Sequence, residues 1–552
     1  MDESLFHEMS MRGQIAEAHQ EAARQQLLRR AQPPRESRHA SVVVRQLARR
    51  IRIRQLKRLI ERMALAMTSD MLLGRSPRKN ETAVASPRRT ASALPVPAQK
   101  PGAARTRLLL EGPIVSTLLR LAVPNAVVNL VLIAVTASVD AHFVGRLGPN
   151  ALAGLSLVFP LLMLMQQMAN ASMGGAIASA IARAIGSGRG QDASALVVHA
   201  LLIACGMAAF FTSALLITGP TIYAVMGGSG ATLAAAVEYS NAIFAGAGAY
   251  WLLSALTSVV RGTGQPTVLA VTYLAAEALH VVLVPMLVFG VGPIPALGIT
   301  GAGLATVTSF TVSTAALAWY IASGRTVLSL SVRSLRLERR FFTEILRVGA
   351  PMSVEPILRN LTLATLSAFV ATLGPIALAG FGVAMRLEYI LYPLTAGLGM
   401  GALALVGTNV GAGQFARAAR IAWTAAAFAG SAAAAIGSVA FAWPNTWSAF
   451  FSADPAVHLT AASYLCIAGL TYPFLGLGLT LSSALQGAGQ PIWPLLANAG
   501  RVLVVTAGGW LAIHVTNTGL PGLGVVAACG LIVYGTTLAL AFHAGAWKKT
   551  RS

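Results

Sequence analysis

The chain has 552 residues, of which 55% are hydrophobic and only 11% are charged. Soluble proteins carry about 25% charged residues, so this composition excludes a string of soluble domains. The formal net charge of +22 could indicate nucleic-acid binding, but in a membrane protein excess Lys and Arg are typical of cytoplasmic segments beside anionic lipid. We therefore expect an integral membrane protein that binds membrane lipids and no nucleic acid.

The basic residues are concentrated at the amino terminus. Residues 1–107 hold 22 of the 41 Lys and Arg residues and leave 29 charged residues for the remaining 445. Apolar residues recur among the arginines of 41–67, a pattern typical of an amphipathic helix on an anionic membrane surface. The Ser- and Pro-rich residues after it favour disorder. Residues 1–107 are thus predicted to be a basic, largely disordered cytoplasmic tail, with a functionless tail or an upstream start codon as alternatives.

Twelve apolar stretches follow the tail, each long enough to cross the roughly 30 Å hydrocarbon core as a helix. They predict an all-α integral membrane protein with an N-terminal six-helix lobe at 108–325, a cytoplasmic linker at 326–341 and a C-terminal six-helix lobe at 342–552. Three cysteines lie inside these stretches and are expected to be small buried residues. The approximate spans are 118–143, 151–178, 194–219, 233–260, 267–290, 299–322, 343–373, 376–406, 416–442, 457–485, 491–515 and 522–546.

Lys and Arg alternate from loop to loop along these spans. Loops on the tail's side hold nearly all of the basic residues, and the opposite loops hold Arg146 and almost nothing else basic. Since cytoplasmic loops are enriched in Lys and Arg, this asymmetry predicts a multi-pass protein of a bacterial-type inner (plasma) membrane with both termini in the cytoplasm. The basic residues on the tail's side are Arg183, Arg189, Arg261, those of 325–347, Arg417, Arg420, Lys548, Lys549 and Arg551.

The two halves repeat one another. Residues 147–154 read LGPNALAG and residues 373–380 read LGPIALAG, and RGTGQP at 261–266 recurs as QGAGQP at 486–491. Six spans per half place both copies in the same orientation, so two similar bundles should face one another across a central cleft and alternate its exposure. No strand precedes the GxGQP segments and no Lys-Ser/Thr follows them, so they indicate turns between helices rather than phosphate-binding loops.

These motifs resemble the multidrug and toxic compound extrusion (MATE) family, as do VDAHFVGRLG at 139–148, GAGLAT at 301–306 and VGAGQ at 410–414. The resemblance covers about residues 108–546. It implies two six-helix lobes in a V-shaped arrangement and the cation-coupled export of organic, often cationic, compounds.

Ionisable residues within membrane spans are costly and therefore mark candidate functional sites. Asp140 follows Pro124 by sixteen residues on the first span, and a proline bends a helix by removing a hydrogen bond. In the family, an Asp downstream of a bending proline in the first helix takes part in proton or sodium coupling, which the resemblance implies for Asp140. The alternative is a structural carboxylate that caps Arg146 or a helix end.

Glu277 and His280 lie three residues apart on the fifth span and so share a helical face. They could share a proton or form a cation-binding face, but two side chains are too few for a dedicated metal site. Many family members carry Asn and then Asp on this helix, at positions that hold His280 and Val284 here. Our hypothesis is that Glu277 replaces that missing carboxylate.

The second half carries Glu355 and Arg359 in a favourable i,i+4 order on the seventh span, with Pro351 as the counterpart of Pro124. Arg386 and Glu388 lie on the eighth span, too close in sequence to face each other. Glu388 could meet Arg359 across helices or face the cleft, where acidic residues would attract cationic cargo. Polar amides, among them Asn170 and Asn409, could line the same cleft or serve only helix packing.

The sequence therefore predicts a monomeric secondary antiporter that exports cationic, drug-like small molecules in exchange for H⁺ or Na⁺, with no other cofactor and no metal site. A flippase for a lipid-linked or polysaccharide precursor is the nearest alternative, and a non-transporting receptor or scaffold is the second. We expect no enzymatic activity, because no nucleophile or metal-ligand constellation is present.

Overall fold

The structure, a computed structural model, describes residues 101–323 and 337–548. The regular elements in these ranges are helices, apart from one antiparallel bridge between Val291 and Ile294. The amphipathic helix predicted at 41–67 and most of the predicted linker lie outside the described residues. The boundaries predicted for the tail, the lobes and the linker stay predictions.

The first half consists of helices that follow one another through short turns. Its elements are α3 (Pro101–Glu111), α4 (Ile114–Gly145), α5 (Pro149–Gln167), the π-helix η1 (Met168–Met173), α6 (Gly174–Gly186), α7 (Gly190–Val225), α8 (Gly230–Ala245), α9 (Ala247–Gly262), α10 (Pro266–Phe289) and α11 (Gly298–Ala322).

The second half follows the same plan. Its elements are α12 (Arg339–Ala371), α13 (Pro375–Gly411), α14 (Phe415–Ala442), α15 (Pro444–Ala449), α16 (Pro455–Ala468), the 3₁₀ turn η3 (Gly469–Thr471), α17 (Tyr472–Gly487), α18 (Ile492–His514) and α19 (Gly519–His543).

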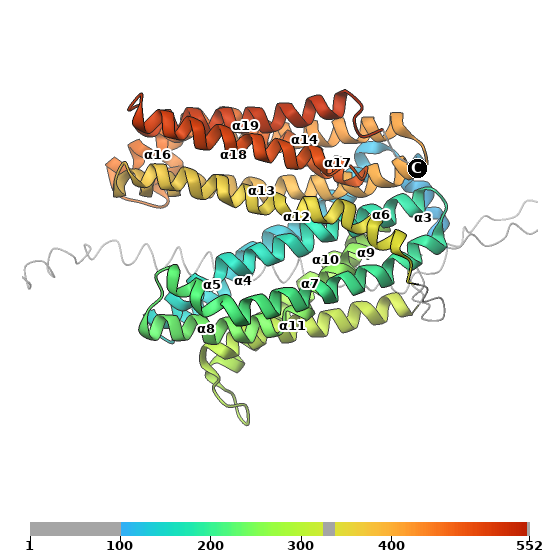
Figure 1. The fold of residues 1–552 in the computed structure, drawn as a ribbon, viewed down its shortest axis with the longest axis horizontal. Coiled ribbons are helices and arrows are strands. Elements are labelled where there is room, and N and C mark those ends of the chain that lie inside the picture. Colours follow the sequence, from blue (N-terminus) through green and yellow to red (C-terminus); the bar gives the residue numbers. More distant parts are fainter. Residues whose placement is uncertain (1–100, 324–336, 549–552) are drawn as a thin grey trace, which may run out of the picture. The chain divides into compact units, whose positions relative to one another are not determined.

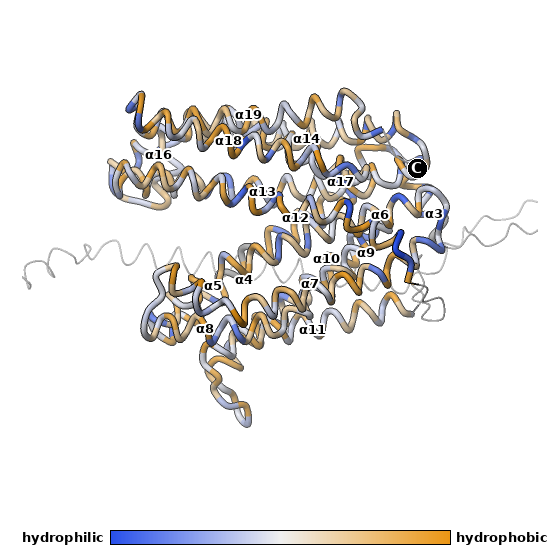
Figure 2. Tube along the Cα trace, in the orientation of Figure 1, coloured by the Kyte–Doolittle hydropathy of each residue, from blue (hydrophilic) through white to orange (hydrophobic). Residues whose placement is uncertain are grey.

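Ten helical stretches among the described residues are long and apolar enough to cross a membrane, and the pair α8–α9, bent by 45°, makes an eleventh. The remaining long helix is α12, which has 33 residues but interrupts its apolar sequence with charged side chains. With α12 included, the described part of the chain has the twelve predicted spans, six in each half. Figure 2 shows hydrophobic colouring along most of these helices. The charged residues of α12 are Arg339, Arg340, Glu344, Arg347, Glu355 and Arg359.

The repeated motifs form matching turns in the two halves. Gly148 and Gly374 have φ of 119° and 101° and each precedes a helix that begins with proline, α5 or α13. Gly264 and Gly489, in the two GxGQP segments, have φ of 73° and 80°. Glycine adopts this left-handed region without the steric cost that other residues meet. The internal repeat and the interpretation of the GxGQP segments as turns between helices are both confirmed.

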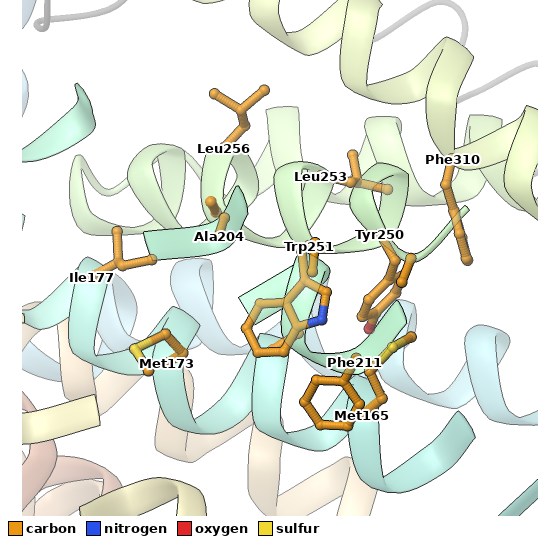
Figure 3. Close-up of a cluster of buried hydrophobic side chains, with 14 of the residues drawn as sticks. Met165, Met173, Ile177, Ala204, Phe211, Tyr250, Trp251, Leu253, Leu256 and Phe310 are labelled. Carbon is orange, nitrogen blue, oxygen red and sulfur yellow. The ribbon is translucent and has the colours of Figure 1, made fainter. Parts of the chain in front are cut away.

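The core of the first half forms around Trp251 of α9 (Figure 3). Its ring centroid lies 5.7 Å from that of Phe211 on α7, and both side chains are buried. Nearby, the Ser254 hydroxyl donates a 2.8 Å hydrogen bond to the Ala169 carbonyl in η1. The wide turn of a π-helix frees backbone carbonyls for such contacts, often at functional sites.

Helix α4 packs against both halves. Near its start, Leu118 and Leu121 share a buried cluster with Leu405 of α13, whereas Val144 near its end belongs to the cluster of the first half. In Figure 1 the helices of the two halves lie together beside α3 and α6 and diverge towards α8 and α16. Close approach depends on small residues, because a Cβ added at Gly397 would lie 2.5 Å from the Ala126 side chain.

The cysteines are not the buried residues that the sequence suggested. Cys205 and Cys529 are exposed, and Cys466 is half-buried. The prediction was wrong because apolar side chains in a membrane protein cover the lipid-facing surface as well as the interior.

Candidate functional site

Three candidate residues of the first half meet in one buried cluster. Asp140 near the end of α4 and Glu277 and His280 on α10 are only 5%, 3% and 2% exposed. Asp140 Oδ1 lies 3.1 Å from His280 Nε2, and Glu277 Oε2 lies 3.9 Å from His280 Nδ1. We call these three side chains the Asp–His–Glu cluster. Asp140 thus contacts an imidazole, and its ion-pair partner among the described residues is His280 and not Arg146.

Two further helices contribute to this cluster. The Tyr239 hydroxyl of α8 donates to Asp140 Oδ2 at 3.5 Å, and the Thr306 hydroxyl of α11 lies 3.1 Å from His280 Nε2. Both side chains are buried. The sequence interpretation did not identify either residue, although Thr306 ends the GAGLAT motif. The polar Thr306 side chain in this glycine-rich start of a helix was the feature that could have identified it from the sequence.

The arrangement of the cluster suits a proton better than a metal ion. The carboxylates of Asp140 and Glu277 lie at different nitrogens of the His280 ring, so their oxygens do not converge on one point. Hard cations prefer several converging oxygen ligands, and no group of three or more His, Cys, Asp or Glu residues in the described ranges could hold a metal ion. An imidazole can accept a proton at one nitrogen and release one from the other.

Helix geometry brings these groups together. Glu277 and His280 share a face of α10 because they are three residues apart, and that face is buried. Helix α4 carries Pro124 inside its length, where a proline cannot donate the backbone hydrogen bond of an ordinary residue and favours a bend. Asp140 therefore lies on the far side of a potential hinge from the start of α4. Helix α12 has Pro351 at the corresponding place.

The carboxylates of the second half lie beside arginines. Glu355 on α12 accepts a 3.5 Å hydrogen bond from the Ser482 hydroxyl, and it interacts electrostatically with Arg359. The Arg359 guanidinium also donates to the Gln167 side chain on α5 and lies 5.3 Å from the centroid of the Tyr392 ring. Arg359 consequently joins the two halves instead of serving only its i,i+4 partner.

Glu388 is buried on α13, and its cationic neighbour is Arg501 of α18. No ion pair joins Glu388 to Arg359 in the described part of the chain, so of the two possibilities considered for Glu388 the structure does not show the contact with Arg359, and a position facing the cleft stays a prediction. Arg501 is a residue that the sequence interpretation missed. The Arg386 guanidinium lies 4.6 Å from the centroid of the Phe451 ring. Residues two apart on a helix point in different directions, which separates Arg386 from Glu388.

The amide candidates have defined partners. Asn170 in η1 accepts a 2.8 Å hydrogen bond from Arg261 Nη2 at its side-chain oxygen. Asn409 donates to the Leu405 carbonyl at 2.8 Å and to the Leu109 carbonyl of α3 at 3.2 Å. The Asn409 amide therefore binds backbone carbonyls of α13 and α3, whereas Asn170 belongs to a half-buried polar contact between η1 and α9.

Besides the contact of Arg359 with Gln167, a second group of hydrogen bonds joins the two halves where α6 packs against α17. The Ser179 hydroxyl donates to the carbonyls of Gln486 and Gly487 at 2.7 and 3.0 Å, and Arg183 contacts Ser179, Gly487 and Glu344 of α12. We call this the seam contact. Its side chains come from both halves, so any separation of the halves here must break these hydrogen bonds.

Comparison with known proteins places this geometry among transporters. The family model MatE matches residues 125–286 and 351–511. The FAD transporter of Shewanella oneidensis is 26% identical over 399 residues, covering 72% of this chain and 87% of that protein. The probable multidrug resistance protein NorM of Thermotoga maritima is 23% identical over 415 residues, covering 74% and 88%.

Solved structures have the same fold. A MATE structure in the bent conformation superposes with a TM-score of 0.75 at 23% identity, covering 82% of this chain and 99% of that chain. A MOP superfamily transporter from Pyrococcus furiosus, described as having a binding pocket of reverse polarity, superposes with a TM-score of 0.73 at 23% identity, covering 81% and 99%. These similarities establish the fold of two six-helix lobes.

Proposed function

This chain belongs to the MatE family, and from that premise we propose that it is a proton-coupled antiporter exporting cationic, drug-like compounds. Its relatives make it a multi-pass membrane protein and an efflux transporter rather than an enzyme. The coupling ion, the cargo, the inner-membrane location and the cytoplasmic termini are the proposed parts. The contact between Asp140 and His280 is the observation that carries the proposal.

The Asp–His–Glu cluster supports proton coupling because it joins separate helices through groups that can change charge. Protonation of Asp140 would remove a buried negative charge and weaken its attraction to His280, which lies on α10. The hydrogen bond from Tyr239 on α8 would change with it. A coupling ion must bind the two facing states with different affinities, and a cluster that exists only while α4, α8 and α10 adjoin provides such a difference.

The balance of charge favours cationic cargo near the first half. Two buried carboxylates, those of Asp140 and Glu277, face a single imidazole there, whereas Glu355 and Glu388 of the second half lie beside permanently charged arginines. Opposite charge attracts a ligand into a cleft of low dielectric. We propose that proton and cationic cargo alternate as counter-charges of the Asp–His–Glu cluster.

The seam contact supports alternating access by lobe movement. Ser179, Arg183 and Gln486 hold α6 against α17, and the opposite-facing state would need these hydrogen bonds to open. The distribution of Lys and Arg favours a cytoplasmic location for this end, which carries the start of α12 and the end of α19.

Efflux from proteoliposomes tests the proposal. Liposomes with the wild-type protein are loaded with a fluorescent cationic dye, and an inward proton gradient or an inward sodium gradient is imposed in separate runs. We expect the proton gradient to accelerate dye release and the sodium gradient to have no effect, with Asp140→Asn losing the acceleration and Arg189→Gln, an exposed control, keeping it. A response to sodium alone, or to neither gradient, would contradict proton coupling.

A dinucleotide cargo is a second candidate, because the Shewanella oneidensis relative is named an FAD transporter. The arginines of the second half, Arg359 and Arg501, offer the charge that phosphates need. The same liposomes distinguish the candidates: FAD that competes with the cationic dye for release, and whose own release depends on Arg359, would support the dinucleotide. No observation favours the flippase or the scaffold.

A further inference from the structure

A small pocket lies between the halves, where α4, α9 and α10 meet α13, away from the Asp–His–Glu cluster. Its volume is about 10 Å³, room for a single water-sized particle and far less than the roughly 300–1,000 Å³ typical of sites for drug-sized ligands. Asn125, which lines it, precedes Asp140 by 15 residues on α4, roughly 22 Å along a straight helix. The lining residues come from α4, from the end of α9, from the start of α10 and from α13: Leu121, Asn125, Arg261, Pro266, Met400 and Ala404.

Arg261 gives this pocket a buried positive charge. Its side chain donates to the side-chain oxygen and the carbonyl of Asn170 at 2.8 and 3.4 Å, and the residue is only 5% exposed. Within the ranges that the structure describes, no carboxylate lies within 4 Å of it, and its buried Nε has no hydrogen-bond acceptor. A buried guanidinium without a counter-charge is strongly unfavourable, so the site requires a negative partner.

The amino end of α10 points to the same kind of ligand. Pro266, the first residue of this 24-residue helix, lines the pocket, and the helix has no side-chain cap. The positive end of the helix dipole and the unpaired amides of the first turn attract anions. In the same turn, Gln265 accepts a hydrogen bond from Tyr320 at 3.3 Å, but its buried Nε2 lacks an acceptor among the described residues.

The internal repeat carries a neutral residue at the position of Arg261. Gln486 occupies the position of Arg261 in the second GxGQP segment, and its amide donates to the carbonyls of Ala171 and Ser172 at 3.1 and 2.9 Å. Both residues therefore bind η1, Arg261 through Asn170 and Gln486 through the next two residues. The contact of Gln486 crosses between the halves and that of Arg261 does not, so the two contacts are different uses of one position of the repeat. The hydrogen bonds of Arg261 to Asn170 bind neutral oxygens and leave its positive charge without a counter-charge.

We propose that Arg261 and the amino end of α10 bind a small monovalent anion, such as chloride, in the pocket between the halves. One singly charged ion neutralises one guanidinium, and the confined volume disfavours larger organic anions. Because the pocket has walls from both halves, bound halide stabilises the arrangement in which α4, α10 and α13 adjoin. The inference rests on the pocket alone and does not depend on which cargo or coupling ion the transporter uses.

Thermal unfolding of the full-length purified protein in nanodiscs tests this site. Sodium chloride or sodium bromide replaces sodium gluconate at constant ionic strength, so that only the anion changes. Ligand that binds the folded state alone raises its stability, and we expect a saturable increase in Tm of about 3 °C in the wild type. Arg261→Gln, which copies the natural residue of the second repeat, should lose the increase, whereas Arg189→Gln, the exposed control, should keep it.

Two further measurements protect the test against a variant that folds poorly. Arg261→Lys keeps the charge and should keep a halide response with lower affinity, and anomalous diffraction from bromide-soaked wild-type crystals should place a peak beside Arg261. A wild type that does not respond to halide, a response that Arg261→Gln fully retains, or stabilisation by inorganic phosphate in place of halide would each overturn the proposal.

Discussion

The two halves of the molecule share a helical plan but surround their buried acids differently. In the first half, Asp140 and Glu277 lie beside the imidazole of His280. In the second half, Glu355 lies beside Arg359, and Glu388 lies beside Arg501. An imidazole changes its charge near neutral pH, whereas a guanidinium does not. The duplication thus preserved helices and turns while the surroundings of the buried acids diverged, with an imidazole beside them in one half and guanidinium groups near them in the other.

Removing Arg501 from the second half should have the largest effect, and it should be an effect on folding. Arg501→Gln removes the cation that interacts electrostatically with the buried Glu388. Because no ion pair within 4 Å joins these two side chains in the described part of the chain, we expect a loss of unfolding free energy below the about 3–5 kcal/mol that breaking a buried salt bridge costs. Denaturation of the purified protein measures the loss. The double variant Glu388→Gln/Arg501→Gln should recover most of it, and an equally unstable double variant would contradict the pairing.

Removing the negative charge of Asp140 in the first half should instead impair transport. Asp140→Asn keeps the size of the side chain but cannot take up the coupling proton, so we expect proton-driven efflux to fall about 100-fold, or about 2.7 kcal/mol, in a folded protein. Initial rates of dye release from proteoliposomes measure the effect.

Glu388→Gln is the matched carboxylate variant of the second half and should reduce the same rate by less than about tenfold. Equal losses in both variants would mean that the two centres have the same role, contrary to the difference in their neighbours.

Substitution of the imidazole sharpens the comparison further. His280→Gln retains a hydrogen-bonding side chain for Asp140 and Thr306 but cannot carry a proton. We expect a loss of roughly tenfold in efflux and a weaker dependence of the rate on pH between about 6 and 8, where histidine ordinarily titrates. The pH profile at a fixed dye gradient checks this, and an unchanged profile would exclude His280 from proton transfer.

The sequence predicted the spans and turns well because their signals are local. Apolar length marks a span, and Gly148 and Gly374 mark the same turn in both halves. The contact between Asp140 and His280 was beyond reach, since periodicity along α4 and α10 does not reveal which helices adjoin. Arg501 was missed because no acid of its own span offered it an i,i+4 partner.

The smallest effect is expected at Arg386, which shares α13 with Glu388 and yet faces elsewhere. Its guanidinium stacks over Phe451, and no carboxylate lies within 4 Å of it in the part of the chain that the structure describes. A cation–π contact of this kind contributes about 0.5–1 kcal/mol at an exposed site. Arg386→Gln should therefore lower the unfolding free energy by no more than this amount and leave proton-driven efflux within about twofold of the wild type.

Arg386→Gln removes the same charge as Arg501→Gln from the same half, so the pair of variants separates position from net charge. A large loss of stability in both would mean that the second half depends on its total positive charge. A loss confined to Arg501→Gln would instead show that what matters is the single guanidinium placed beside Glu388. Since Arg386 and Glu388 are two residues apart on one helix and point in different directions, we expect the second result.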